Sequence, residues 1–364
     1  MKGLVSYRRP VVLIVIIDAI AFSLLFLYKQ PFDWYVLPAG LLVIGLICAS
    51  FHVITRKSLG EEYLFLITAM LTSLGFIMIY RLDPVYGFRQ IMWFSAGILL
   101  FFLSFFVFLK FRFWHRLFYY YVSISLALFI LTLSLGESVK GSKNWLEIGK
   151  FSFQPSELIK ILFILSLACC FSKSEQVIFK GLSISFPQSP VRYRIVLALV
   201  SYMLLGFLVL QREWGTAIVF FLVYATLVYA FDDSPRFFAL NAAAAVLGAV
   251  AGYMTLYHIR DRVETWLDPW KDIAGKGYQI TQSLFAIAEG GFFGTGIGMG
   301  RPDLIPAVNT DFIFSAICEE MGIFGGVAVI LLYFILTYRG VKISLRVKNP
   351  FYRATALGIT LMFG

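Results

Sequence analysis

The stretch of sequence that decides the fold runs from His258 to Thr310 and reads HIRDRVETWLDPWKDIAGKGYQITQSLFAIAEGGFFGTGIGMGRPDLIPAVNT. It is dense in Asp, Arg, Lys, Gly and Gln, and a long apolar run flanks it on each side. An apolar run of about 20 residues is long enough to cross a bilayer as a helix. The sequence therefore predicts that this segment folds at one face of a membrane and that functional residues gather there.

The composition of the whole chain is that of a membrane protein. Of its 364 residues, 60% are hydrophobic and only 14% are charged, whereas a soluble domain carries about 25% charged residues. Because a backbone in lipid must satisfy its own polar groups, we expect an all-α, polytopic transmembrane helix bundle. The net charge of +10 does not indicate nucleic acid, because the basic residues lie in short loops between apolar runs, as in membrane proteins.

Ten complete spans are predicted by length and hydropathy. They run near residues 10–28, 33–55, 62–80, 87–109, 116–135, 156–172, 193–211, 214–231, 236–257 and 311–337. An eleventh run begins near Arg353 and stops at Gly364. It is too short to cross, so we expect the natural chain to continue beyond it.

The distribution of Lys and Arg sets the expected orientation. The short loops on the side of the N-terminus carry most of these residues, which places that side in the cytoplasm. The two long polar loops, 136–155 and 258–310, then share the outer face. This arrangement predicts an outward-facing site, while the inner loop 173–192 is interpreted as a connector.

Two carboxylates lie in the motif WLDPWKDIAGKGYQ, at Asp268 and Asp272. The proline and the two glycines of this motif break helices, so both carboxylates are expected on turns. A carboxylate close to apolar surface can act as a general base. The alternative is a turn cap or an ion pair with a neighbouring arginine or lysine.

Two segments follow this motif. Residues 277–288 alternate polar and apolar side chains at helical spacing, which predicts a short interfacial helix whose Gln279, Gln282 and Ser283 line a polar pocket. Residues 290–300, GGFFGTGIGMG, hold six glycines. Close packing between helices is the favoured interpretation, and binding of a pyrophosphate by backbone amides is the alternative.

Ionisable residues also occur inside the predicted spans. Glu157 and Lys160 are three residues apart and share a helix face, as an ion pair or as part of a cavity. Glu319 and Glu320 lie deep in the last complete span, so at least one should have a basic partner in a polar core. Asp18 is a weaker case of the same kind.

Other polar residues are expected to be ordinary. The outer turn at Arg212 and Glu213 is interpreted as solvated. The three histidines are far apart and no metal site is predicted. The cysteines all lie in apolar runs and are interpreted as packing residues: Cys48, Cys169, Cys170 and Cys318.

Four motifs in this order resemble one known family. They are GSKNWLEIGKFSFQPSELIKI (141–161), LQREWGTAIVF (210–220), DPWKDIAGKGYQITQSLFAIAEGGFFGTGIGMG (268–300) and NTDFIFSAICEEMGIFG (309–325). They look like the signature segments of the shape, elongation, division and sporulation (SEDS) family. The resemblance implies a core of about ten helices at 59–364, and it makes residues 1–58 look like two additional N-terminal spans.

The resemblance also implies a function. The family polymerises lipid II into peptidoglycan strands at the outer face of the bacterial cytoplasmic membrane, for cell elongation, division or sporulation, with a class B penicillin-binding protein as partner. By motif, Asp272 matches the family's key carboxylate, Asp268 being the weaker candidate. Lys160 matches its essential lysine, Glu157 the neighbouring acid and Trp145 the tryptophan of the preceding outer loop.

The implied reaction is an inverting glycosyl transfer with a polyprenyl pyrophosphate leaving group. Asp272 fits the base, and Lys160 fits the group that compensates the pyrophosphate charge. Further residues expected to bind substrate are Glu157, Trp145, Gln279, Gln282, Arg260, Arg262 and Lys276. No cofactor is certain, although a divalent cation (Mg or Mn) could assist.

Two alternatives remain open. A lipid II flippase would need charge reaching both faces, which Glu319 and Glu320 favour. A non-catalytic scaffold that activates a class B penicillin-binding protein is favoured by departures from the family pattern, such as Asn144 in place of the usual arginine and the absence of the usual Glu and His from the run PAVNTD at 306–311. Retention of Asp272 and Lys160 argues against a scaffold.

Overall fold

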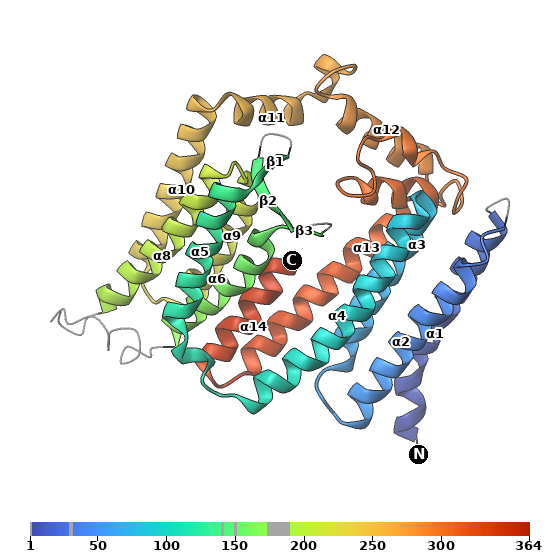
Figure 1. Ribbon diagram of the computed structural model, residues 1–364, viewed down its shortest axis with the longest axis horizontal. Coiled ribbons are helices and arrows are strands. Elements are labelled where there is room, and N and C mark those ends of the chain that lie inside the picture. The colour runs from blue at the N-terminus through green and yellow to red at the C-terminus, as the bar shows by residue number, and fades with distance from the viewer. Residues whose placement is uncertain (1, 29–31, 140–141, 149–150, 173–189) are drawn as a thin grey trace. The chain divides into compact units, whose positions relative to one another are not determined.

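The computed structural model describes residues 2–28, 32–139, 142–148, 151–172 and 190–364, so most of the predicted inner loop 173–192 lies outside the described residues. Within the described residues, long helices are joined by short connections, apart from two longer segments, 136–154 and 256–312 (Figure 1). The helices in chain order are α1 (Lys2–Tyr28), α2 (Val36–Arg56), α3 (Glu62–Leu82), α4 (Pro84–Lys110), α5 (Phe118–Leu135), α6 (Pro155–Phe171), α8 (Pro190–Leu210), α9 (Trp214–Phe231), α10 (Pro235–Thr255), α11 (Tyr257–Leu267), α12 (Tyr278–Gly290), α13 (Ile313–Arg346) and α14 (Pro350–Phe363).

The predicted spans are confirmed as helices. Among the described residues, nine helices are long and apolar enough to cross a membrane. Helix α6 has 17 residues and α14 has 14, and they coincide with the span predicted at 156–172 and with the final short run. The all-α, polytopic expectation therefore holds.

Prolines place the starts of several helices. A proline suits the first helical turn because its missing N–H would have no intrahelical partner there, and its fixed φ already matches the helix. Five of the described helices begin with this residue, at Pro84, Pro155, Pro190, Pro235 and Pro350.

The chain divides into two compact units, the first formed by Met1–Phe108 and Gly252–Leu336. In this unit α1, α2 and α3 pack together around buried side chains that include Phe22, Val43 and Phe76. Asp18 is fully buried in α1 and accepts a 3.0 Å hydrogen bond from Ser73 of α3. Its polar partner is thus a hydroxyl and not the basic group expected for a carboxylate inside a span.

The second unit is formed by Leu109–Ala251 and Thr337–Gly364. Helix α6 lies at its centre and contacts α5, α8, α9 and α14. Its interior includes Phe163, which stacks on Phe220 of α9 at 4.5 Å between ring centroids. Cys169 and Cys170 are buried in the same helix, which agrees with their interpretation as packing residues.

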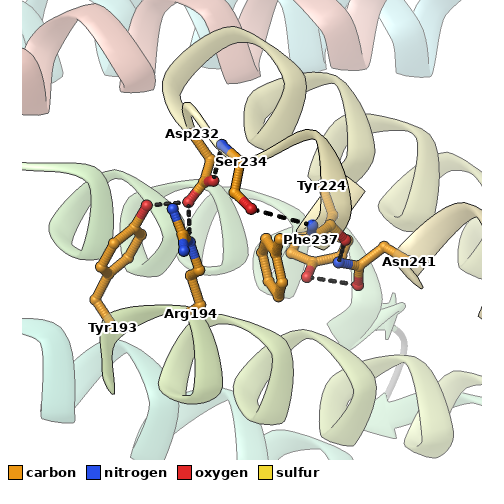
Figure 2. A network of polar contacts seen from close by, with 7 residues as sticks. All are labelled: Tyr193, Arg194, Tyr224, Asp232, Ser234, Phe237 and Asn241. Carbon is orange, nitrogen blue, oxygen red and sulfur yellow. Dashed lines mark hydrogen bonds and ion pairs between the residues drawn. The ribbon is translucent and has the colours of Figure 1, made fainter. Parts of the chain in front are cut away.

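A carboxylate ties together α8, α9 and α10 in the second unit (Figure 2). Asp232 follows α9 and accepts hydrogen bonds from Arg194 Nε at 2.8 Å, from the Tyr193 hydroxyl and from the Ser234 backbone N–H at 2.8 Å. Burial alone would raise the pKa of Asp232, but these donors hold it below its usual value. Further along, Tyr202 and Tyr224 both donate to Asn241 Oδ1, at 2.9 and 2.8 Å. This network was not predicted from the sequence.

The polar loop at 136–155 contains an antiparallel sheet in the order β1 (Glu137–Val139), β2 (Ser142–Ile148), β3 (Phe151–Phe153). These strands were not predicted. The available signal was the Gly-Lys pair that separates LEI from FSF, because a two-residue connection with glycine is typical of a hairpin. Trp145 lies on β2 opposite Glu137.

Candidate functional site

The segment 258–310 forms a chain of short helices between α10 and α13, drawn in orange in Figure 1. Helix α11 is followed by the 3₁₀ turn η2 (Pro269–Asp272), by α12 and by a second 3₁₀ turn, η3 (Pro302–Leu304). The helix predicted at 277–288 is confirmed as α12. All of these elements belong to the first unit.

Asp272 ends η2, and Asp268 caps its start, so both carboxylates lie on turns as predicted. The Asp272 side chain is exposed, and its Oδ2 accepts a hydrogen bond from the backbone N–H of Lys276 at 3.1 Å. Its backbone carbonyl accepts from the N–H groups of Gly275 and Gly277 at 3.2 and 3.0 Å. These hydrogen bonds hold the turn together and leave the Asp272 carboxylate exposed to solvent.

Both glycines of this turn lie where a side chain would meet neighbouring atoms, and only at Gly277 are those atoms backbone. A Cβ at Gly275 would lie 2.4 Å from Asp272 Oδ2. A Cβ at Gly277 would lie 2.0 Å from the backbone carbonyl oxygen of Pro269, which cannot move aside as a side chain can. In the motif DIAGKG, the glycines therefore allow the Asp272 carboxylate and the Pro269 carbonyl to lie directly against backbone that carries no side chain.

Two basic residues of the same segment, Lys276 and Arg260, have partners. Lys276 Nζ forms an ion pair with Asp261 and donates to the Tyr257 hydroxyl at 3.0 Å. The hydrogen bond to Asp261, with that to Tyr257, raises the pKa of Lys276. Arg260 donates to the backbone carbonyl of Met254 at 3.0 Å. Arg260 precedes the Asp272 turn in sequence and Lys276 follows it.

Arg262 and the predicted pocket residues of α12 are placed differently. The Arg262 side chain is exposed on α11. Gln279 Nε2 donates to the backbone carbonyl of Pro306 at 2.8 Å, which ties α12 to the segment before α13. Ser283 is buried and donates to Ile280 of its own helix, whereas Gln282 is half-buried. The structure therefore does not use these three residues as one polar pocket.

A second polar group lies at the start of α6, in the second unit. Lys160 Nζ and Glu157 Oε1 form an ion pair of 2.7 Å, which confirms the predicted pairing on one helix face. Their side chains are 25% and 58% exposed. The ammonium group of Lys160 is therefore paired with Glu157 and remains partly accessible.

The turn before α9 corrects one interpretation. Glu213 was expected to be solvated, but it is only 7% exposed. Its Oε1 accepts hydrogen bonds from Gln154 Nε2 at 3.0 Å and Ser156 Oγ at 3.4 Å. These donors precede and open α6, so the carboxylate connects the starts of α6 and α9. Half-buried Trp145 belongs to this same unit, as do Glu157 and Lys160.

The two glutamates of α13 have the basic partner that was expected. Glu319 and Glu320 are 2% and 1% exposed, and Arg81 Nε of α3 lies 2.6 Å from Glu320 Oε1. A basic partner was predicted for at least one of the two glutamates, but not which residue it would be. Arg81 directly follows the span predicted at 62–80, and a basic residue at that position was the signal available.

The glycine-rich run 290–300 packs closely against α13, which was the favoured interpretation. A Cβ at Gly290 would lie 2.0 Å from the carbonyl oxygen of Cys318, and a Cβ at Gly294 would lie 2.2 Å from that of Glu320. No group of three or more His, Cys, Asp or Glu side chains in the described part of the chain could hold a metal ion.

These features define a polytopic helical membrane protein with two polar regions rich in ionisable groups. The sequence model of the family of cell cycle proteins that comprises FtsW, RodA and SpoVE matches residues 61–364. The chain belongs to this family.

Curated relatives share this similarity over most of their length. The peptidoglycan glycosyltransferase RodA of Mycobacterium leprae (strain TN) is 30% identical over 346 residues, covering 91% of this chain and 74% of the relative. Stage V sporulation protein E of Bacillus subtilis (strain 168) is 30% identical over 322 residues, covering 85% of each.

Solved structures share the fold. A chain from a peptidoglycan synthase complex, described as coordinating polymerization and crosslinking, matches with a TM-score of 0.66 and 29% identity, covering 83% of both chains. The rod shape determining protein RodA of Thermus thermophilus matches with a TM-score of 0.58 and 23% identity, covering 83% of this chain and 81% of that one.

Proposed function

We propose that this protein is a peptidoglycan glycosyltransferase that polymerises lipid II, with Asp272 as its general base. The observation that carries the proposal is the state of the Asp272 carboxylate. It is exposed, it is held by one backbone N–H, and among the described residues it forms no ion pair. A base must be free to accept a proton at the substrate, and this carboxylate meets that condition.

The reaction follows from the chemistry of the substrates. The 4-hydroxyl of the acceptor sugar attacks the anomeric carbon of the donor, and the new carbon–oxygen bond forms as the bond to the polyprenyl pyrophosphate breaks. Asp272 takes the hydroxyl proton. A single displacement inverts an α-linked donor to a β-1,4 linkage, and the leaving pyrophosphate carries away the bonding electron pair.

Lys160 compensates the charge on the leaving pyrophosphate. Its ion pair with Glu157 orients the ammonium group at the start of α6, and its side chain stays partly accessible. Electrostatic stabilisation of a leaving group is strongest when the cation is held in place before the reaction. Further residues proposed to contact the substrate are Glu157, Trp145, Gln279, Gln282, Arg260, Arg262 and Lys276.

A divalent cation, Mg or Mn, is proposed only as an assistant that neutralises the pyrophosphate. Magnesium is usually bound through substrate phosphates and one or two carboxylates rather than by a protein cage. That mode fits a described chain without a three-residue ligand cluster. Loss of polymerisation on addition of EDTA, restored by Mg²⁺ or Mn²⁺, supports this role, and full activity in EDTA contradicts it.

The proposed partner is a class B penicillin-binding protein, and the proposed site faces outward from the cytoplasmic membrane. The partner is supported by the likeness to a chain from a complex that couples polymerization to crosslinking. The outward orientation is supported by the Lys and Arg distribution, which places the loops 136–155 and 258–310 on the outer face.

The flippase alternative loses its main support. It depended on Glu319 and Glu320 as charges at depth, but both are buried and Glu320 is paired with Arg81. Carboxylates engaged in this way hold structure rather than line an open path. A non-catalytic scaffold makes no glycan, so the polymerisation assay separates the scaffold alternative from the proposed enzyme.

The experiment is polymerisation of lipid II by the purified protein, alone and with candidate class B partners. In a background lacking reactive thiols, Lys276→Cys and Lys143→Cys should react with a membrane-impermeant reagent in sealed, right-side-out vesicles, while Lys342→Cys should not. Lipid II confined to the outer leaflet should be polymerised in the same vesicles. Movement of lipid II between leaflets without glycan formation would instead establish the flippase.

A further inference from the structure

Helix α13 is interrupted inside its membrane-spanning stretch, and a loop repairs the break. Gly322 has φ 69° and ψ −173°, which no helix contains. The glycine-rich loop, defined as residues 291–301, then bonds to the opened backbone. Thr295 and Gly296 donate to the carbonyls of Glu319 and Glu320, at 2.9 and 3.0 Å, and the N–H of Ile323 donates back to Gly291 at 2.9 Å. Such pairing is required because lipid offers no partner for free backbone groups.

The side chains of the two glutamates hold the same loop. Glu320 Oε2 accepts a 3.1 Å hydrogen bond from the backbone N–H of Gly298, and Glu319 Oε1 accepts one from that of Arg301. Arg81 is 9% exposed by side chain and completes the arrangement, because it binds Glu320 and also donates to the carbonyl of Gly300 at 2.6 Å. One guanidinium therefore fastens the loop from α3 while neutralising a carboxylate of α13.

Helix α1 also contacts the glycine-rich loop. A Cβ at Gly298, whose φ is +85°, would lie 2.8 Å from the ring of Tyr28 at the end of α1. Ile297 packs into the core that α1 shares with α2 and α3. The glycine-rich loop thus contacts α1, α3 and α13, all within the first unit.

A series of contacts connects this loop to the turn that carries Asp272. Helix α12 ends at Gly290, which packs on α13, and the start of α12 is pinned by Gln279 to Pro306. The turn η2 contacts α12, and the rings of Trp270 and Phe285 lie 5.7 Å apart across that contact. A displacement of the loop therefore moves α12 and, with it, the turn that carries Asp272.

We propose that Arg81 is a positioning residue for glycan polymerisation: it fixes the glycine-rich loop to α3 and so sets the place of Asp272. The inference rests on the proposed function for its kinetic part. Arg81 touches no substrate in this role and acts through Glu320, the loop and α12. Lysine cannot fully replace it, because an ammonium lacks the planar fork that binds Glu320 and the Gly300 carbonyl together.

The first arm of the test is kinetic. Arg81→Met should lower kcat by about 10- to 100-fold, since a shift of about 1 Å at a catalytic group has effects of that order, while KM for lipid II changes little. Arg81→Lys should be intermediate. Arg89→Met, which removes an exposed arginine of α4, is the matched control and should behave as wild type.

The second arm separates positioning from folding. Arg81→Met alone leaves a buried carboxylate unpaired, so its thermal stability should fall. The double variant Arg81→Met/Glu320→Gln removes that charge and keeps an acceptor for Gly298. It should regain stability but not kcat. Recovery of both together would show that Arg81 is structural only and would overturn the proposal.

The third arm needs no activity. Hydrogen–deuterium exchange of the full-length protein in detergent should rise in Arg81→Met across residues 291–301 and extend into 272–290, with helices of the second unit unchanged. Exchange confined to 291–301, or wild-type kcat in Arg81→Met, would refute the proposal. If wild-type protein makes no glycan, the proposed function fails, and the exchange result still decides whether Arg81 positions the Asp272 turn.

Discussion

Replacement of Asp272 by asparagine separates chemistry from folding at the proposed site. The carboxylate is exposed, and within the described structure its hydrogen bond is to the Lys276 backbone N–H at 3.1 Å. Asparagine has nearly the same shape, and its carbonyl oxygen can accept the same bond. It lacks the basicity that takes a proton from the acceptor hydroxyl.

The expected magnitudes differ widely. One exposed hydrogen bond contributes about 0.5–1.5 kcal/mol, and asparagine retains most of it, so stability should change by less than about 1 kcal/mol. Loss of a general base lowers the rate by about 10²- to 10⁴-fold. At about 1.4 kcal/mol for each factor of ten, the transition state loses about 3–5 kcal/mol.

The assay is lipid II polymerisation by purified protein, read as glycan length and initial rate beside the midpoint of thermal unfolding. Asp268→Asn is the matched control, because it changes a carboxylate in the same motif and should reduce the rate far less. Equal rates for wild type and Asp272→Asn would refute the base assignment. A large fall in the unfolding midpoint of Asp272→Asn would show that the turn needs the charge.

Three further outcomes test other parts of the structure. Lys160→Met should lower kcat by about 10²-fold with unchanged folding, as for removal of one electrostatic contact to a developing charge, measured in the same assay. Gly294→Ala should destabilise the protein by at least about 2 kcal/mol, because φ is +83° and the new Cβ meets the Glu320 carbonyl; Gly206→Ala, with open space around it, should not. The pKa of Asp232 is lowered from 3.8, so its contribution to stability is present above pH 3.8 and is lost as the pH falls through the folded pKa. Thermal unfolding of wild type from pH 7 down to pH 3 should show this loss, and Asp232→Asn should show a smaller one.

Much of the fold could be predicted from hydropathy and from the residues that form turns. The spans were predictable because bilayer thickness sets a minimum apolar length, and the Asp272 turn was predictable because proline and glycine interrupt a helix at known places. The strands at 137–153 were missed since two of the three have only three residues, which is too short for an alternating pattern of side chains to stand out.

Pairings between distant residues could not be predicted in the same way. Sequence position indicated that Glu320 needs a cation but gave no means to choose Arg81, which is far away in the chain. The burial of Glu213 was predicted wrongly for a related reason. A polar turn between two spans is usually solvated, and only the packing of α6 against α9 shows that Gln154 and Ser156 cover it.

The contrast between Asp272 and Glu320 explains why this protein keeps charges in its interior. An ionisable group inside a span costs about 2.5–3.5 kcal/mol, and a buried ion pair contributes little net stability. Such a pair does select one arrangement, because any other leaves a charge uncompensated. As the proposed base, Asp272 must stay exposed and free of cations, so it cannot be held by strong contacts of its own. Its precision has to come from elsewhere, and the Arg81–Glu320 pair with its glycine-rich loop supplies a rigid reference at the other end of α12.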